Sequence, residues 1–263
     1  MSLFNRKKKL DSQTMQNGAK LITIANPQSV VSEQFRNIRT NINFMNVDKE
    51  MKIIAFTSAM ASAGKSNVSA NVAVTVAQAG KKTLLVDADL RRPTLHSTFN
   101  VTNSNGLTTL LTNRGDKIDV NSVVRDSGIP NLSILTAGPI PPNPSELLSS
   151  KHMIDLLDKL KDEYDMIIID LAPVLDAAET QQLTSSLDGV VLVVRQSFSQ
   201  KAAVKRAVEL LHLTKSNILG YVLNDVDADG DGGYGYGYGY GYGYGYGEEP
   251  EKKGLFGRKK NKY

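Results

Sequence analysis

The sequence predicts an α/β fold in which a mostly parallel β-sheet is flanked by helices. Between residues 51 and 226, short β-rich runs alternate with helical stretches, the order of elements found in a sheet wrapped by helices. The cores of these runs are continuously apolar, as expected for strands that are covered on both faces. The expected strands cover residues 52–57, 83–87, 132–136, 165–170, 189–195 and 217–224.

Helices are expected between these strands. The first begins at Lys65 and ends before Gly80, a residue suited to a left-handed C-cap. A second begins at Asn143 as N-cap, with Pro144 in the first turn and Glu146 at the third position. A third is expected over residues 199–213.

An amphipathic helix is expected over residues 29–45, before the first strand. Its apolar residues recur at three- and four-residue steps, and they are Phe35, Ile38, Ile42 and Met45. Three charged residues lie on an arc away from this stripe, and they are Glu33, Arg36 and Arg39. The helix therefore has a core face and a separate charged face, although most charged stripes are simply solvated.

Composition excludes several classes of protein. With 263 residues, of which 41% are apolar and 22% charged, the chain has the make-up of a globular protein of one or two domains. The net charge of +4, from 31 basic and 27 acidic residues, is too small to indicate nucleic-acid binding. The absence of cysteine excludes disulfides and cysteine nucleophiles. No apolar run approaches the roughly 20 residues of a membrane span, and we expect a cytoplasmic protein.

The C-terminal region consists of a strict Gly-Tyr alternation from residue 233 to residue 247. Such a segment cannot build a core, because its glycines are costly to order and its tyrosines have no aliphatic partners. We therefore expect a basic flexible arm over residues 1–28, a globular domain over 29–225 and a disordered tyrosine-rich, basic tail over 226–263. The alternation contains seven of the ten tyrosines, which are Tyr234, Tyr236, Tyr238, Tyr240, Tyr242, Tyr244 and Tyr246.

The strongest chemical signal is Gly64-Lys65-Ser66, which follows an expected strand and opens an expected helix. This arrangement surrounds a phosphate with backbone N–H groups and a helix N-terminus. Lys65 would reach the β- and γ-phosphates of a nucleotide, and the Ser66 hydroxyl would coordinate Mg²⁺. The alternative is a chance occurrence in an ordinary turn, which is favoured by Ala59 at the place of the usual first glycine and by the absence of glycine from residues 61–63.

Three aspartates follow two other expected strands. Asp87 and Asp89 come at the end of one, and Asp170 ends another. In an open α/β sheet, ligands bind at the carboxyl ends of the strands, so these carboxylates are expected to converge beside the phosphate loop. A single aspartate at such a place is usually a cap or a turn residue, but three beside Gly-Lys-Ser predict a site for a metal ion and a phosphate.

These motifs together resemble those of the bacterial tyrosine kinases of capsular and exopolysaccharide synthesis. The resemblance is carried by the Gly-Lys-Ser motif, by residues 85–93 and 167–173, by the Glu-x-x-Arg-x-x-Arg spacing from Glu33, and by the tyrosine-rich tail. It covers nearly the whole chain and implies the P-loop NTPase fold. Related ATPases that position septa or partition DNA share the sheet and similar motifs but not the tyrosine tail.

The resemblance implies phosphoryl transfer from ATP, with Mg²⁺, to tyrosine. The catalytic residues that it implies are Lys65, Asp87, Asp89 and Asp170, of which Asp87 or Asp89 would accept the tyrosine proton. Its metal ligands are Ser66, Asp87 and Asp170. Its nucleotide-binding residues are Ala61, Ser62, Ala63, Gly64, Lys65, Ser66, Asn67 and Asn224. Asn224 corresponds to a position that contacts adenine, although a lone asparagine there could equally be a turn former.

The resemblance also implies partners. Glu33, Arg36 and Arg39 would join copies into a homo-oligomer, with a ring expected, in which the seven tail tyrosines are phosphorylated in trans. One separate transmembrane protein, which serves as activator and chain-length regulator, and a cognate tyrosine phosphatase would act on the kinase at the inner face of the membrane. Two alternatives stay open at this point: an ATPase switch like MinD or ParA, and a catalytically impaired ATP-binding scaffold.

Overall fold

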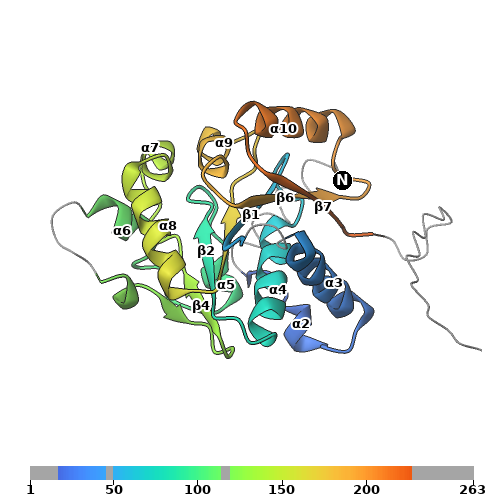
Figure 1. Ribbon diagram of the computed structural model, residues 1–263, viewed down its shortest axis with the longest axis horizontal. Coiled ribbons are helices and arrows are strands. Elements are labelled where there is room, and N and C mark those ends of the chain that lie inside the picture. The colour runs from blue at the N-terminus through green and yellow to red at the C-terminus, as the bar shows by residue number, and fades with distance from the viewer. Residues whose placement is uncertain (1–16, 46–49, 114–118, 227–263) are drawn as a thin grey trace, which may run out of the picture. The chain divides into compact units, whose positions relative to one another are not determined.

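The computed structural model describes residues 17–45, 50–113 and 119–226. These residues form a seven-stranded sheet with helices on both faces (Figure 1). The strand order is β3-β4-β2-β5-β1-β6-β7, and every pair is parallel except β3 with β4. The strands are β1 (Ile53–Ser58), β2 (Thr83–Ala88), β3 (Arg125–Asp126), β4 (Leu132–Leu135), β5 (Met166–Leu171), β6 (Gly189–Arg195) and β7 (Ile218–Asn224).

The mostly parallel α/β fold expected from the sequence is thereby confirmed. All residues of β1, β2 and β5 are buried, which explains their continuous apolar runs, since helices cover both faces of a parallel sheet. The six expected strands are all present within one residue of their predicted bounds. The sequence did not predict β3, because two residues are too few to give a periodic pattern.

The helices connect successive strands and cover the two faces. They are α2 (Ile22–Ala25), α3 (Val30–Met45), α4 (Lys65–Gln78), α5 (Leu95–Thr98), α6 (Leu107–Thr112), α7 (Pro144–Leu148), α8 (Lys151–Glu163), α9 (Ala178–Thr184) and α10 (Lys201–Leu213), with a short 3₁₀ helix at Val120–Ser122. Gly80 has φ +89°, as expected of the left-handed residue after α4.

The helix predicted to begin at Asn143 differs in detail. It does begin at Pro144, but it ends at Leu148. The side chain of Asn143 makes no capping bond to the backbone of this helix, and its Nδ2 atom donates instead to Glu146 Oε2 at 2.5 Å. A separate helix, α8, follows, and the Ser150 hydroxyl caps it by accepting from the Met153 N–H at 3.3 Å.

Helix α3 lies on one face of the sheet beside α4 (Figure 1). Phe35 and Ile42 are buried, and Ile38 packs against the same apolar cluster. The prediction that Met45 faces the core is wrong, because Met45 is 51% exposed and its neighbour Phe44 is 71% exposed. The last turn of α3 therefore lies outside the core.

Part of the predicted N-terminal arm packs on the globular domain. Residues 17–28 include α2, whose Thr23 is buried. The Thr23 hydroxyl and N–H both donate to Asn71 Oδ1 on α4, at 2.9 and 3.1 Å. The remainder of the arm and the tail from residue 227 onward lie outside the described residues. In the described parts of the chain, no helix is both long and apolar enough to span a bilayer.

Candidate active site

The phosphate loop covers residues 59–64 and joins β1 to α4. Gly64, at the N-terminus of α4, has φ +89°. A Cβ atom there would lie 2.1 Å from Asn224 Nδ2, so any larger residue would displace the Asn224 amide. Ser62 also has a left-handed backbone, with φ +67°, a conformation that is uncommon for residues other than glycine. The loop therefore makes its tight turn although residues 61–63 contain no glycine.

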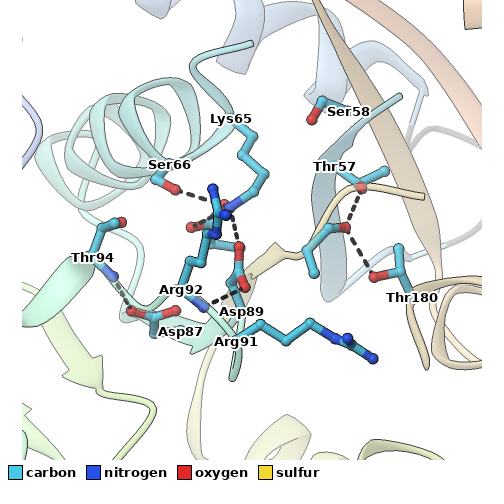
Figure 2. A network of polar contacts seen from close by, with 12 residues as sticks. Thr57, Ser58, Lys65, Ser66, Asp87, Asp89, Arg91, Arg92, Thr94 and Thr180 are labelled. Carbon is cyan, nitrogen blue, oxygen red and sulfur yellow. Dashed lines mark hydrogen bonds and ion pairs between the residues drawn. The ribbon is translucent and has the colours of Figure 1, made fainter. Parts of the chain in front are cut away.

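Lys65, the first residue of α4, points into a group of acidic side chains (Figure 2). Its Nζ atom lies 2.8 Å from Asp89 Oδ2 and 3.5 Å from Asp170 Oδ2. It also donates to the Ser66 hydroxyl at 3.2 Å. Burial alone would lower the pKa of Lys65, but the charges of Asp170 and Asp89 outweigh it and hold the pKa above its usual value. Lys65 is therefore a buried cation.

Asp87 and Asp170 are paired in register across the adjacent strands β2 and β5. Asp87 Oδ2 accepts the N–H groups of Thr94 and Leu95, both at 3.0 Å, so this oxygen caps α5. Within the described residues, Asp87 Oδ1 is buried without a hydrogen bond. Burial, followed by the charge of Asp170, raises the pKa of Asp87 to about 8. Both effects favour the neutral, protonated form of the Asp87 carboxyl group.

Asp170 is the most isolated of the three carboxylates. It is fully buried, and in the described part of the chain neither of its oxygens makes a hydrogen bond of normal geometry. Burial raises the pKa of Asp170, against the opposing charge of Lys65. Asp89 is better satisfied, since its Oδ1 accepts the Arg92 N–H at 3.0 Å while its Oδ2 contacts Lys65. The structure thus brings Asp89 and Asp170 into contact with Lys65 beside the phosphate loop and places Asp87 next to Asp170 on the adjacent strand, while the roles of the three carboxylates stay predictions.

The structure gives other contacts to the two asparagines predicted to bind nucleotide. Asn224 Nδ2 donates to the Ala63 carbonyl oxygen at 3.0 Å. Asn67 Nδ2 donates to the Lys20 carbonyl oxygen at 3.2 Å, which holds the N-terminal segment against α4. Their roles toward a nucleotide stay predictions. Ala61, Ser62 and Ala63 lie in the loop itself, and Ala63 is buried.

The three charged residues of α3 have contacts within the chain. Glu33 and Arg36 form an ion pair at 2.6 Å, and Arg36 also donates to the Pro27 carbonyl oxygen at 2.5 Å. Arg39 donates to the Thr75 carbonyl oxygen near the end of α4, at 2.9 Å. A role in joining subunits stays a prediction for these residues. The seven predicted acceptor tyrosines lie outside the described residues.

Sequence analysis missed a buried acid near the site. Glu179 on α9 is 1% exposed, accepts from Arg91 Nε at 2.6 Å and from the Ser145 hydroxyl at 2.7 Å. Burial would raise the pKa of Glu179, but these hydrogen bonds outweigh it and lower the pKa. Arg91 consequently points away from Lys65 (Figure 2). The sequence did not indicate that Glu179 is buried, because a glutamate in the first turn of a helix is usually exposed.

A second missed residue is Arg195, the last residue of β6. Its guanidinium donates to the Ser62 carbonyl oxygen of the phosphate loop at 3.3 Å. The sequence indicated only that Arg195 is a cation at the end of an apolar strand. The strand order that brings it to the loop was not readable.

This chain is similar to known proteins over most of its length. Residues 51–219 match the AAA domain family. The tyrosine-protein kinase YwqD of Bacillus subtilis is 46% identical over 204 residues, which cover 78% of this chain and 85% of YwqD.

Two solved structures share the fold and a good part of the sequence. The kinase domain of the Escherichia coli tyrosine kinase Etk has a TM-score of 0.76 and 33% identity, over 83% of this chain and 85% of that domain. The chimerical protein CapA2B2 has a TM-score of 0.73 and 39% identity, over 82% of this chain and 97% of the chimera. This chain therefore belongs to the bacterial tyrosine kinases and is a protein-tyrosine kinase built on a P-loop NTPase domain.

Proposed function

We propose that this kinase uses Mg-ATP to phosphorylate, on a neighbouring copy of itself, the tyrosines between residues 234 and 246, and that it thereby regulates capsular or exopolysaccharide synthesis. One observation carries the assignment of the site. A buried lysine lies among three buried carboxylates at the point where the phosphate loop meets the carboxyl ends of β2 and β5. Phosphoryl transfer requires such charge neutralisation and positioning more than covalent chemistry.

The unpartnered oxygens fit a bound cation. Asp87 Oδ1 and Asp170 Oδ1 are buried without a hydrogen bond in the described residues, and Asp170 Oδ2 has the long ion pair with Lys65 at 3.5 Å. Leaving buried carboxylate oxygens so poorly satisfied is costly unless a ligand satisfies them. Mg²⁺ prefers oxygen ligands and keeps several waters and phosphate oxygens. In the described residues no three acidic or histidine side chains could hold a metal by themselves. We therefore assign the ion to Ser66, Asp87 and Asp170, directly or through waters, together with the phosphates.

Lys65 has two successive partners in this proposal. Without nucleotide it neutralises Asp89 and Asp170. With Mg-ATP bound, the charge of Lys65 would stabilise the phosphates, and Asp170 would help to hold the ion. Asp89 Oδ2, which contacts Lys65 at 2.8 Å in the nucleotide-free structure, would then be available to accept a proton from tyrosine. Asp87 is the alternative base, although one of its oxygens is held by two backbone N–H groups.

Oligomerisation would bring the acceptor tyrosines to a neighbouring site. We propose Glu33, Arg36 and Arg39 for the contact between copies, since they lie on the outer helix α3 and Glu33 is 59% exposed. Phosphates on all seven tyrosines would add about −10 to −14 charges to a chain with a net charge of +4. Phosphorylation should therefore dissociate the assembly. Charge reversal at Arg36 and Arg39 should lower the mass found by light scattering, and an unchanged mass would argue against this contact.

The wider setting rests on the family. A separate transmembrane activator and a tyrosine phosphatase would control the kinase at the inner face of the membrane. The similarity to the chimerical protein CapA2B2 supports cooperation with a second polypeptide. Basic clusters at both ends of the sequence, starting at Arg6 and at Lys252, would add attraction to anionic lipids of about 1 kcal/mol per basic residue.

The decisive experiment maps phosphotyrosine by mass spectrometry after incubation with Mg-ATP, with and without a candidate activator fragment. We expect phosphate between residues 234 and 246 that disappears in Lys65→Met and persists in Lys205→Met, which alters an exposed lysine of α10. Mixing Lys65→Met with an active chain that lacks the seven tyrosines tests transfer in trans. Phosphate on the Lys65→Met chain supports it, whereas no phosphate on either chain would refute it.

A further inference from the structure

Two side chains from outside the phosphate loop bind consecutive carbonyl groups within it. Arg195 Nη1 at the end of β6 donates to the Ser62 oxygen at 3.3 Å, and Asn224 Nδ2 at the end of β7 donates to the Ala63 oxygen at 3.0 Å. Both donors come from the side of the sheet opposite to β5 and β2, since β1 lies between β5 and β6. The loop is thus anchored from the side that carries none of the three carboxylates.

Because the peptide bond is planar, fixing the direction of a carbonyl group in the loop also fixes the direction of the N–H group that follows it. In a trans peptide the C=O and the following N–H point in opposite directions, and no cis peptide occurs in the described residues. Fixing the Ser62 oxygen toward β6 therefore turns the Ala63 N–H the other way. The Ala63 oxygen, held by Asn224, does the same for the Gly64 N–H. Two successive N–H groups therefore point away from Arg195 and Asn224, the supports on the side of β6 and β7.

Successive N–H groups of this kind form an anion-binding concavity when left-handed residues alternate with others. Ser62 and Gly64 have φ +67° and +89°, and Ala63 between them has a negative φ. A serine in the left-handed region is strained and persists when its surroundings hold it. The two carbonyl contacts supply this support from residues 133 and 161 positions away in the sequence.

Arg195 is itself oriented by a second contact. Its Nε and Nη2 atoms both lie 2.8 Å from Asp225 Oδ2, and its guanidinium lies 5.2 Å from the centre of the Phe198 ring. The guanidinium is a rigid fork, so this grip leaves Nη1 facing the Ser62 oxygen. A lysine could reach one of these partners but not hold both in the same plane.

We infer that Arg195, oriented by Asp225, is a positioning residue for phosphate binding, and that together with Asn224 it aims the Ala63 and Gly64 N–H groups at a nucleotide's phosphates. The inference rests on the proposed use of Mg-ATP at this loop. It gives Asn224 a support role in place of the adenine contact that its position suggested. Neither Arg195 nor Asp225 touches the reacting atoms in this scheme.

The test measures Mg-ADP affinity by calorimetry and the KM for ATP. Removing a charge-assisted hydrogen bond should weaken Mg-ADP binding about tenfold in Arg195→Ala, raise KM for ATP similarly and change kcat less than about threefold. Arg195→Lys and Asp225→Asn, which keep side-chain volume, should each weaken binding about threefold. They keep the test valid if Arg195→Ala does not fold. Arg206→Ala on α10, an exposed arginine paired with Glu209 at 3.3 Å, is the matched control and should bind normally.

The outcomes separate this inference from the proposed function. If Lys65→Met abolishes Mg-ADP binding while the Arg195 and Asp225 variants bind within twofold of the unaltered protein, the positioning role is refuted and the nucleotide site stands. If Lys65→Met binds as tightly as the unaltered protein, the site itself is wrong. A purely structural role would lower the melting temperature of the nucleotide-free variants and leave their KM unchanged, which also overturns the inference.

Discussion

The phosphate loop has two sides that differ in how their polar groups are satisfied. On the side of β5 and β2, oxygens of Asp170 and Asp87 are buried without hydrogen bonds in the described residues. On the side of β6 and β7, Arg195 and Asn224 are bonded to loop carbonyls, and Arg195 is also paired with Asp225. An unpartnered buried oxygen costs stability, so its presence marks the side that awaits a ligand. The satisfied side supports the loop.

The largest effect on activity is expected from a substitution at Asp170, on the side with the poorly satisfied carboxylates. Asp170→Asn keeps the shape of the side chain but removes the charge, so the initial rate of tyrosine phosphorylation should fall about 100-fold or more. The melting temperature should stay the same or rise, because burying the Asp170 charge is costly and Lys65 keeps its closer ion pair with Asp89 at 2.8 Å. Initial rates with labelled ATP and a thermal scan check both parts. A variant that loses stability and activity together would show that Asp170 is a structural residue.

Gly64→Ala tests the contact between the two sides. The new Cβ would lie 2.1 Å from Asn224 Nδ2 and should push the amide off the Ala63 oxygen. We expect Mg-ADP affinity to fall about tenfold and the free energy of unfolding to fall by about 1 kcal/mol. Gly80→Ala is the control, because Gly80 has the same φ of +89° and, among the described residues, no atom lies within 4 Å of its Cβ position. Equal affinities in the two variants would contradict the steric argument.

The carboxylates on the side of β5 and β2, here called the acidic side, should also make the stability of the nucleotide-free protein depend on pH. Folding raises the pKa of Asp87 from 3.8 to about 8, so between these values the folded state holds an extra proton. Raising the pH therefore destabilises it, by at most about 1.4 kcal/mol per pH unit, or about 3–5 °C in melting temperature.

Melting curves between pH 6.5 and 8 measure this slope. The window lies above the ordinary pKa of His96, 6.5, which burial lowers and which acts in the opposite sense below that value. Asp87→Asn should flatten the slope. A melting temperature that rises with pH in the unaltered protein would contradict the raised pKa.

The smallest effect is expected far from the loop. Arg206 and Glu209 form an exposed pair on α10, at 3.3 Å, and water solvates both groups when the pair is broken. Arg206→Ala should change the free energy of unfolding by less than about 0.5 kcal/mol. A chemical denaturation curve measures it. If Arg206→Ala lowered the free energy of unfolding as much as Gly64→Ala does, the exposed pair on α10 would be as important for stability as the phosphate loop, which would contradict this comparison.

Local patterns were sufficient for much of the fold. Continuous apolar runs located the six expected strands within one residue, and the left-handed Gly80 ended α4 where predicted. Sequence patterns gave wrong predictions where the tertiary surroundings decide whether a side chain is buried or which partner it binds. Met45 continues the apolar stripe of α3 but is exposed, since no periodicity reveals where a helix passes the edge of the core. Asn143 is a residue type that often caps helices, yet its side chain makes no cap and instead donates to the carboxylate of Glu146.

The sequence by itself determined the chemistry of the acidic side. Lys65 and Ser66 are adjacent in the chain, and each carboxylate ends a strand, so parallel pairing was enough to bring them together. Only the tertiary structure decided the supporting side. Arg195 reaches Ser62 across 133 positions because β6 pairs with β1 in the sheet. Strand order arises from the packing of the whole domain, whereas the motifs are local, and for this reason the residues that support the loop could not be read from the sequence.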